Sequence, residues 1–367
     1  VVDESPYQIT SKDGHVFWIL DFSMLLTGEK ELALDTAREA FQSAFEQVWY
    51  GQLEDDGFNR LVLGADLSGR QVAIIRALAK YNRRIGTSFS QTYVENTFSH
   101  YPAIASSLIQ LFESKFDPAQ YTSNDVVTSI SAELEQQLDN VANLDDDRII
   151  RRFIEMIHAT LRTNFYQPNS EGDNKPYISF KIEPNKIADV PLPLPKFEVF
   201  VYSPRIEGVH LRGGKVARGG LRWSDRREDF RTEVLGLVKA QQVKNTVIVS
   251  VGAKGGFVCK QLPTTGGRDA FFAEGQACYK TFIRGLLDIT DNIVHGEVSP
   301  PENVVRHDDD DPYLVVAADK GTATFSDIAN SISEEYDFWL GDAFASGGSV
   351  GYDHKKMGIT ARGAWEA

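Results

Sequence analysis

The hydrophobic pattern of this sequence changes its period once, and that change limits the possible folds most. From residue 29 to about 165, apolar residues recur at helical spacing, as at Ile74, Leu78 and Tyr81. From residue 177 onward, short β-like runs such as 177–182 and 196–203 alternate with helical segments. Strands that alternate with helices indicate an α/β layer built on a mostly parallel sheet. We therefore predict a helical region followed by an α/β domain.

The α/β part divides into specific expected elements. A polar linker at 167–175 leads into the first strands, followed by helices over about 227–243 and 268–287 and strands over 246–251 and 313–318. In parallel sheets, ligands bind at the carboxyl ends of strands. Lys254 and Asp319 each follow an expected strand closely, which makes them candidate site residues.

The first 25 residues carry a hairpin signal. Residues 7–25 read as two strands joined by Lys12-Asp13-Gly14, because Asp-Gly between apolar runs favours a tight turn. A lone hairpin is marginally stable in water, so we expect it to pair with strands that lie outside this sequence.

Charge and cysteine content exclude several classes of protein. The net charge is −14, whereas nucleic-acid and anionic-membrane surfaces need an excess of Lys and Arg. No apolar run reaches the roughly 18 residues of a membrane span. Cys259 and Cys278 show no metal-binding spacing, which favours reduced thiols in a cytoplasmic protein and no bound metal.

Against this acidic background, the segment 218–257 is locally basic and rich in glycine. Arg218, Lys239, Lys244 and Lys254 lie among glycine pairs that let backbone approach a ligand closely. Several cations with exposed amides form a site for carboxylate groups. The segment therefore predicts binding of a small, multiply charged anion.

Two alternatives remain for each candidate catalytic residue. Lys254, within G-A-K-G-G, is either an exposed turn lysine or an amine that acts as a general base among other cations. Asp319, after the apolar run YLVVAA, is either a turn-capping carboxylate or a proton shuttle. Their matching positions favour the catalytic interpretation of both.

Other charged runs are interpreted as solvated. The cations between Arg70 and Arg84 are read as an exposed helix face rather than a phosphate site. The acidic run 307–311 lacks the spacing of a calcium loop and is read as a solvated loop. Neither a Walker A motif nor G-x-G-x-x-G occurs.

Five motifs in order carry a family resemblance. These are RGGLRW, then EV at 233–234 with Gln241 and Lys244, then GAKGG, then AADKGT, and last GGSVG…TARG, and in this order they resemble the glutamate/leucine/phenylalanine dehydrogenase superfamily. The amino-acid sequence of residues 219–258 looks most similar to the very large bacterial NAD-specific glutamate dehydrogenases. The resemblance implies oxidative deamination of L-glutamate to 2-oxoglutarate and ammonia, with NAD as cofactor.

The resemblance also implies a role for each substrate-binding residue. Arg218 would hold the side-chain carboxylate, with the Gly219 backbone beside it. Gln241 and Lys244 would contact the amino acid, Lys244 at its α-carboxylate. A guanidinium at position 218 suits a second carboxylate better than an aliphatic side chain, which favours glutamate over leucine or phenylalanine.

For the chemical step, the resemblance makes Lys254 the catalytic lysine and Asp319 the catalytic aspartate. Lys254 would activate water and Asp319 would pass a proton to the departing ammonia. Thr360, in TARG, would lie near the nicotinamide amide of the cofactor.

The resemblance implies a domain organisation as well. We expect a truncated β piece of an upstream regulatory domain at 1–27, a helical region at 28–166 and the substrate-binding catalytic domain at 176–367. The nucleotide-binding domain is expected to be missing, so this chain alone should be inactive. The full-length enzyme is expected to be a homo-oligomer. The open alternatives are an amino-acid dehydrogenase with another side-chain preference and a non-catalytic glutamate-binding or assembly module.

Overall fold

The computed structural model describes residues 2–24, 34–121, 123–244, 252–350 and 354–366. Contacts divide the chain into two compact units, 1–38 and 39–367, with the boundary inside helix α1 (Leu34–Trp49).

The first unit contains the predicted hairpin. Strands β1 (Asp3–Thr10) and β2 (Val16–Ser23) pair antiparallel, with Tyr7 opposite Ile19. Gly14 adopts φ +82° in the connecting turn, a conformation that glycine tolerates without a Cβ penalty. The hairpin prediction is confirmed. Trp18 remains 59% exposed on it.

The second unit begins with the predicted helices. After the end of α1 come η1 (Gly57–Arg60), α2 (Leu61–Gly64), α3 (Gly69–Arg84), α4 (Gln91–His100), α5 (Pro102–Phe116), α6 (Asn124–Leu138) and α7 (Leu144–Ala159). Helix α3 starts with a capping box, in which the Ser68 hydroxyl accepts from the Gln71 amide and Gln71 accepts from the Ser68 amide. The helical pattern expected to reach 165 ends at Ala159, where β3 follows directly.

The rest of this unit is an eight-stranded sheet in the order β12-β11-β7-β8-β6-β5-β4-β3. Its strands are β3 (Thr160–Thr163), β4 (Ile178–Ile182), β5 (Phe197–Tyr202), β6 (Ile206–Arg212), β7 (Ala217–Trp223), β8 (Ala253–Cys259), β11 (Leu314–Ala318) and β12 (Ala345–Ser346). Separate from it, β9 (Asn292–Val294) and β10 (Glu297–Ser299) form a small hairpin.

The expected parallel pairing lies in the half of the sheet that carries the candidate site. Strands β12, β11, β7 and β8 pair parallel, whereas β8-β6-β5-β4-β3 pair antiparallel. Parallel neighbours need a long crossover, here α8 (Phe230–Lys244) between β7 and β8. Loops without a crossover helix join β3 to β6, which gives the antiparallel half. The α/β class, with its helical region and N-terminal hairpin, is confirmed.

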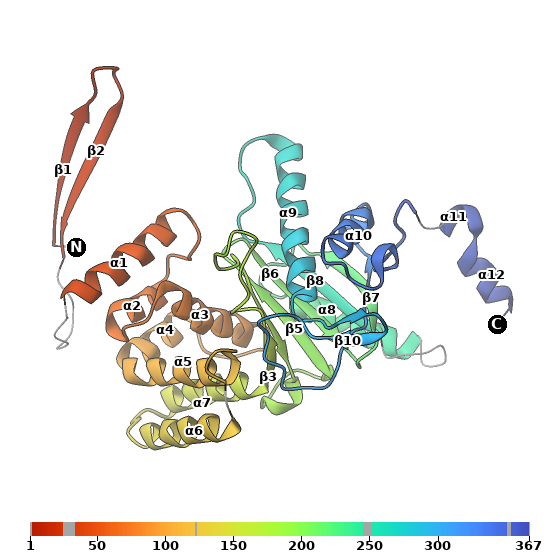
Figure 1. Ribbon diagram of the computed structural model, residues 1–367, viewed down its shortest axis with the longest axis horizontal. Helices are drawn as coiled ribbons and strands as arrows, with labels where there is room; N and C mark the ends of the chain where they lie inside the picture. The colour runs from red at the N-terminus through yellow and green to blue at the C-terminus, as the bar shows by residue number, and fades with distance from the viewer. Residues whose placement is uncertain (1, 25–33, 122, 245–251, 351–353, 367) are drawn as a thin grey trace. The chain divides into compact units, whose positions relative to one another are not determined.

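Helices cover both faces of the sheet, and two hydrophobic cores result. Phe200 and Leu211 face a core shared with α3–α7 and α8, whereas Val201 and Leu221 face a core shared with α9 (Gly267–Leu287) and α10 (Ser326–Glu335). Figure 1 shows α9 lying across the strands. The remaining elements are η2 (Pro184–Lys186), η3 (Gly341–Ala343), α11 (His354–Met357) and α12 (Ile359–Glu366).

The cations of α3 do not form the expected solvated face. Arg76 is fully buried and makes two 2.8 Å hydrogen bonds to the Asp56 carboxylate. Arg84 bonds Glu207 of β6 at 2.7 Å, and both side chains are less than a tenth exposed. The expectation of exposure was wrong for Arg76 and Arg84, because partners distant in sequence allow these cations to be buried, whereas the Arg83 side chain is 50% exposed.

The acidic run was likewise expected in a solvated loop, and this expectation was wrong for two of its carboxylates. Asp308 lies between Arg162 of β3, at 2.6 Å, and Lys181 of β4, at 2.5 Å. Asp311 is buried between Lys181 and Arg212 of β6, at 2.5 and 2.6 Å. The loop therefore neutralises three cations that project from neighbouring strands.

Candidate active site

Three parallel strands bring the candidate residues together. In the β7–β8 register Leu221 is opposite Gly255, and in the β11–β7 register Ala318 is opposite Leu221. One step back along each strand, Gly220 lies beside Lys254. Since side chains alternate along a strand, Arg218, Gly220 and Arg222 share the face of the sheet that Lys254 occupies.

Lys254 and Asp319 meet at this level. The Lys254 ammonium lies 3.5 Å from Oδ2 of Asp319, with the side chains 24% and 16% exposed. Asp319 follows β11, as predicted. Lys254 instead lies near the start of β8, while the strand expected at 246–251 falls wholly outside the described residues. The register of the strands explains the meeting, because Lys254 lies level with Ala317, next to the last residue of β11. Lys254 is thus not an exposed turn lysine.

A tight turn fixes Asp319 behind β11. The Thr322 amide donates to the Asp319 carbonyl at 3.2 Å, and Gly321 adopts φ +83° within the turn. The buried Thr322 hydroxyl lies 3.0 Å from the Asp319 amide nitrogen and donates to the Leu221 carbonyl of β7 at 2.7 Å. The sequence DKGT therefore anchors the aspartate backbone to the neighbouring strand.

A guanidinium holds one oxygen of the aspartate. Arg222 donates to Oδ1 of Asp319 from Nη2 at 3.0 Å and from Nε at 3.3 Å, and the Lys320 amide donates to the same oxygen at 2.6 Å. Burial disfavours the ionised form of Asp319, yet the Lys320 amide and the Arg222 guanidinium outweigh it and lower the pKa of this carboxyl. Asp319 is therefore an anion at neutral pH.

Glycines make room for this arrangement. A Cβ on Gly219 would lie 1.5 Å from the Ala253 carbonyl oxygen, so no other residue fits beside β8. A Cβ on Gly252 would lie 2.2 Å from Nε2 of Gln241, which places the Gln241 amide against the backbone just before Lys254. Gly219 and Gln241 therefore belong to the same cluster as Lys254 and Asp319.

Family models match the chain over most of its length. The model of the bacterial NAD-glutamate dehydrogenase catalytic domain matches residues 133–367. The chain belongs to this family. Glutamate dehydrogenase helical motif 3 matches 53–118, and the glutamate dehydrogenase ACT3 domain matches 1–37.

Individual relatives agree with the family models. NAD-specific glutamate dehydrogenases from Halomonas elongata and Pseudomonas aeruginosa are 57% and 58% identical over 100% of this chain. The enzyme of that name from Mycobacterium tuberculosis is 53% identical, also over the whole chain. The chain spans about a quarter of the length of these relatives, 23–24%.

The other residues that the glutamate dehydrogenase resemblance singled out are placed in part. Arg218 is exposed on β7, on the same face as Lys254, and the described residues offer it no ion-pair partner. Lys244 is the last residue of α8, one turn beyond Gln241, but its side chain is outside the described positions. Thr360 lies in α12, and its side chain is also outside them.

Sequence reasoning missed two residues of the site, Arg222 and Glu233. Glu233 of α8 accepts from Arg222 at 2.7 Å and from the Ser224 hydroxyl at 2.6 Å. Both lie within the quoted motifs, but neither received a role. Recognition of 217–223 as a strand would have placed Arg222 on the face of Arg218 and thus near Lys254.

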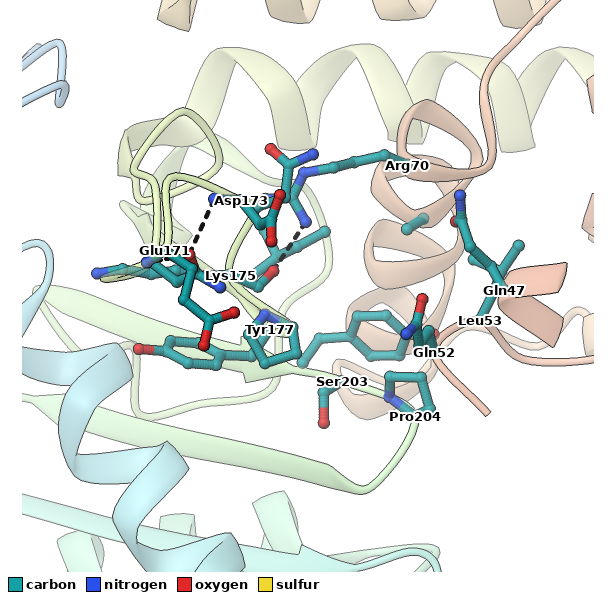
Figure 2. Close-up of a pocket in the computed structure, with 16 residues that line it drawn as sticks. Gln47, Gln52, Leu53, Arg70, Glu171, Asp173, Lys175, Tyr177, Ser203 and Pro204 are labelled. Carbon is teal, nitrogen blue, oxygen red and sulfur yellow. Dashed lines mark hydrogen bonds between the residues drawn. The ribbon is translucent and has the colours of Figure 1, made fainter. Parts of the chain in front are cut away.

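A cavity of about 520 Å³ lies elsewhere in the second unit. Figure 2 shows Arg70 of α3 facing the loop that carries Asp173 and Lys175, and Arg70 donates to the Lys175 carbonyl at 2.9 Å. None of the candidate catalytic residues lines this cavity.

In the described part of the chain, no helix is long and apolar enough to span a membrane.

Proposed function

We propose that this protein oxidises L-glutamate to 2-oxoglutarate and ammonia with NAD. The observation that carries the proposal is the contact of Lys254 with Asp319, 3.5 Å apart, on the sheet face that also presents Arg218. A half-buried amine beside an ionised carboxylate provides the two groups needed for proton transfer at one carbon. The Arg218 guanidinium, which has no ion-pair partner among the described residues, suits a dicarboxylate substrate.

One group of residues is proposed to bind the two carboxylates of the substrate, and another to act at its α-carbon. Arg218 binds the side-chain carboxylate of glutamate, and Lys244 binds its α-carboxylate, with Gly219 and Gln241 beside the substrate. This holds the α-carbon over Lys254 and Asp319. Such positioning removes much of the entropic cost of the reaction.

In the hydrolytic half of the reaction, Lys254 in its neutral amine form takes a proton from the water that attacks the substrate iminium, so the α-carbon gains a hydroxyl and Lys254 becomes an ammonium. Asp319 relays a proton from this ammonium, 3.5 Å away, to the substrate amine. The C–N bond then breaks to release ammonia, and the hydroxyl gives its proton to Lys254 as the 2-oxo group forms. Oδ2 is the oxygen available for this transfer, because Oδ1 already accepts three hydrogen bonds.

NAD, when bound, would accept the hydride from the α-carbon. This chain has no G-x-G-x-x-G loop to cradle its diphosphate. Thr360, which the resemblance places near the nicotinamide, is therefore the one residue proposed to contact NAD.

The domain division proposed for this chain remains a β piece at 1–27, a helical region at 28–166 and a catalytic domain at 176–367. The family matches at 1–37, 53–118 and 133–367 support three such parts. We also propose a cytoplasmic homo-oligomer. Two buried, free cysteines, Cys259 and Cys278, support the reducing compartment.

The experiment compares kcat/KM of the full-length protein for glutamate, leucine and phenylalanine, each with NAD and NADP. We expect glutamate with NAD to be preferred by at least about 100-fold, since a site built for a charged group rejects substrates that lack it. A preference for leucine or phenylalanine would indicate another dehydrogenase, and glutamate binding without turnover a binding module. Residues 1–367 alone are expected not to reduce NAD.

A further inference from the structure

The two oxygens of the Asp319 carboxylate have different surroundings. Oδ1 accepts from Arg222 Nη2 and Nε and from the Lys320 amide, at 3.0, 3.3 and 2.6 Å. Oδ2 receives none of these bonds and lies 3.5 Å from the Lys254 ammonium. One oxygen is therefore held by the protein, and the other is left for chemistry.

This orientation needs a specific restraint. The terminal torsion of an aspartate is broad and roughly two-fold, so rotation readily exchanges its oxygens. The Lys320 amide alone is a single donor on the flank of the carboxylate. Arg222 adds two donors in a rigid fork, both to Oδ1, so an exchange of the two oxygens would break three hydrogen bonds instead of one.

Glu233 of helix α8 in turn holds the Arg222 guanidinium in place. Its Nη1 donates to Glu233 Oε1 at 2.7 Å, and the Ser224 hydroxyl donates to Glu233 Oε2 at 2.6 Å. The Arg222, Glu233 and Asp319 side chains are only 13–18% exposed, so solvent screens these pairs weakly.

The absence of a side chain at Gly256 permits this connection. Gly256 is opposite Arg222 in the β7–β8 register, and a Cβ there would lie 2.7 Å from Val234 of α8. Helix α8 therefore packs close enough to the sheet for Glu233 to reach Arg222. The same helix carries Gln241 and Lys244, the residues proposed to bind the substrate, together with Glu233, which bonds the group that orients the aspartate.

We propose that Arg222 is a positioning residue, anchored by Glu233, that presents Oδ2 of Asp319 to the substrate and to Lys254. This inference rests on the proposed function, because it assigns Arg222 to the same reaction. Arg222 does not exchange a proton. It acts through Asp319, and Glu233 acts through Arg222.

The test uses the full-length protein with Arg222→Gln, Arg222→Lys and Glu233→Gln. The matched control is Arg226→Gln, which removes an exposed arginine paired with Asp229 in the segment before α8. We expect Arg222→Gln to lower kcat about 100-fold with KM for glutamate changed less than about threefold, as for misplacement of a catalytic group. Arg222→Lys should recover part of that loss, and Glu233→Gln should lower kcat about 10-fold.

A pH profile separates positioning from a merely structural role. The charged groups that face Asp319 are Arg222 from β7 and Lys254 from β8, and Glu233 from α8 lies behind Arg222. Loss of Arg222 removes a cation that favours the ionised carboxylate. The acidic limb of kcat should therefore move to higher pH in Arg222→Gln and stay in place in Arg226→Gln.

Two results would overturn the inference alone. One is turnover in Arg222→Gln equal to that of Arg226→Gln, and the other is an unmoved acidic limb in a folded variant. If Arg222→Gln does not fold, Arg222→Lys and Glu233→Gln decide by the same criteria. A wild-type protein without glutamate turnover would overturn the proposed function and this role together.

Discussion

Lys254 and Asp319 lie 3.5 Å apart although a whole strand, β7, separates the strands that carry them. The residue of β7 at this level is Gly220, and a Cβ there would lie 3.1 Å from Oδ2 of Asp319. The carboxylate thus reaches across a glycine to approach the lysine. This explains why RGGLRW needs its second glycine as well as the first.

Gly220→Ala should therefore impair catalysis more than folding. A contact of 3.1 Å forces Asp319 to shift by a few tenths of an ångström, and we expect kcat to fall at least about 10-fold. The unfolding free energy should fall by about 1–3 kcal/mol, as for mild overpacking. Steady-state kinetics and urea unfolding measure the two effects.

The control is Gly236→Ala in α8, where a Cβ would meet nothing within 4 Å. It should leave kcat unchanged. Equal kinetics in the two variants would contradict the crowding of Asp319.

Arg218→Leu should separate side-chain recognition from chemistry. The guanidinium is exposed on the site face without a described partner, so its removal leaves no buried charge behind. We expect kcat/KM for glutamate to fall at least about 100-fold, whereas norvaline, which lacks the second carboxylate, should change less than about threefold. Equal loss for both substrates would remove Arg218 from side-chain recognition.

Short sequence motifs predicted those elements that a few consecutive residues determine. The Asp13-Gly14 hairpin was found where expected. Strands β6 and β7 were missed because glycines such as Gly208 and Gly219 are rare in strands. Those glycines serve close packing, since a Cβ on Gly208 would lie 2.6 Å from Phe282 of α9.

The burial of charged side chains could not be predicted from their neighbours in the sequence. Arg76 and Asp311 belong to charged runs typical of solvated surfaces, but each has partners far away in the sequence. The same limit applied to the site. Lys254 and Asp319 were identified, whereas Arg222 depends on the strand register and on the position of α8.

The buried carboxylate of Asp311 predicts a pH-dependent stability. Burial disfavours its ionised form, but Arg212 and Lys181 outweigh that effect and lower its pKa to about 2. The folded value lies below the usual 3.8. The contribution is therefore complete above about pH 4 and is lost as the pH falls toward 2, and it amounts to about 2 kcal/mol.

Asp311→Asn should cost about 3–5 kcal/mol at pH 7, because it leaves two buried cations without their shared anion. Urea unfolding of this chain, followed by tryptophan fluorescence, measures the loss. The difference in unfolding free energy between this variant and the wild type should be smaller at pH 3 than at pH 7. Asp310→Asn, at an exposed position paired with Arg306, should change stability by less than about 1 kcal/mol. A similar small change for Asp311→Asn would contradict the role of the buried network.

Lys254→Ala tests the centre of the site. Loss of the amine removes the proposed base, and we expect kcat of the full-length protein to fall by about 10²–10⁴ or beyond detection. Lys254→Arg should not restore it, because a guanidinium keeps the charge but does not give up a proton at neutral pH. Lys280→Ala, which removes an exposed lysine of α9, serves as the control and should retain turnover. Turnover in Lys254→Ala comparable to this control would exclude Lys254 as the base and leave Asp319 without its proposed partner.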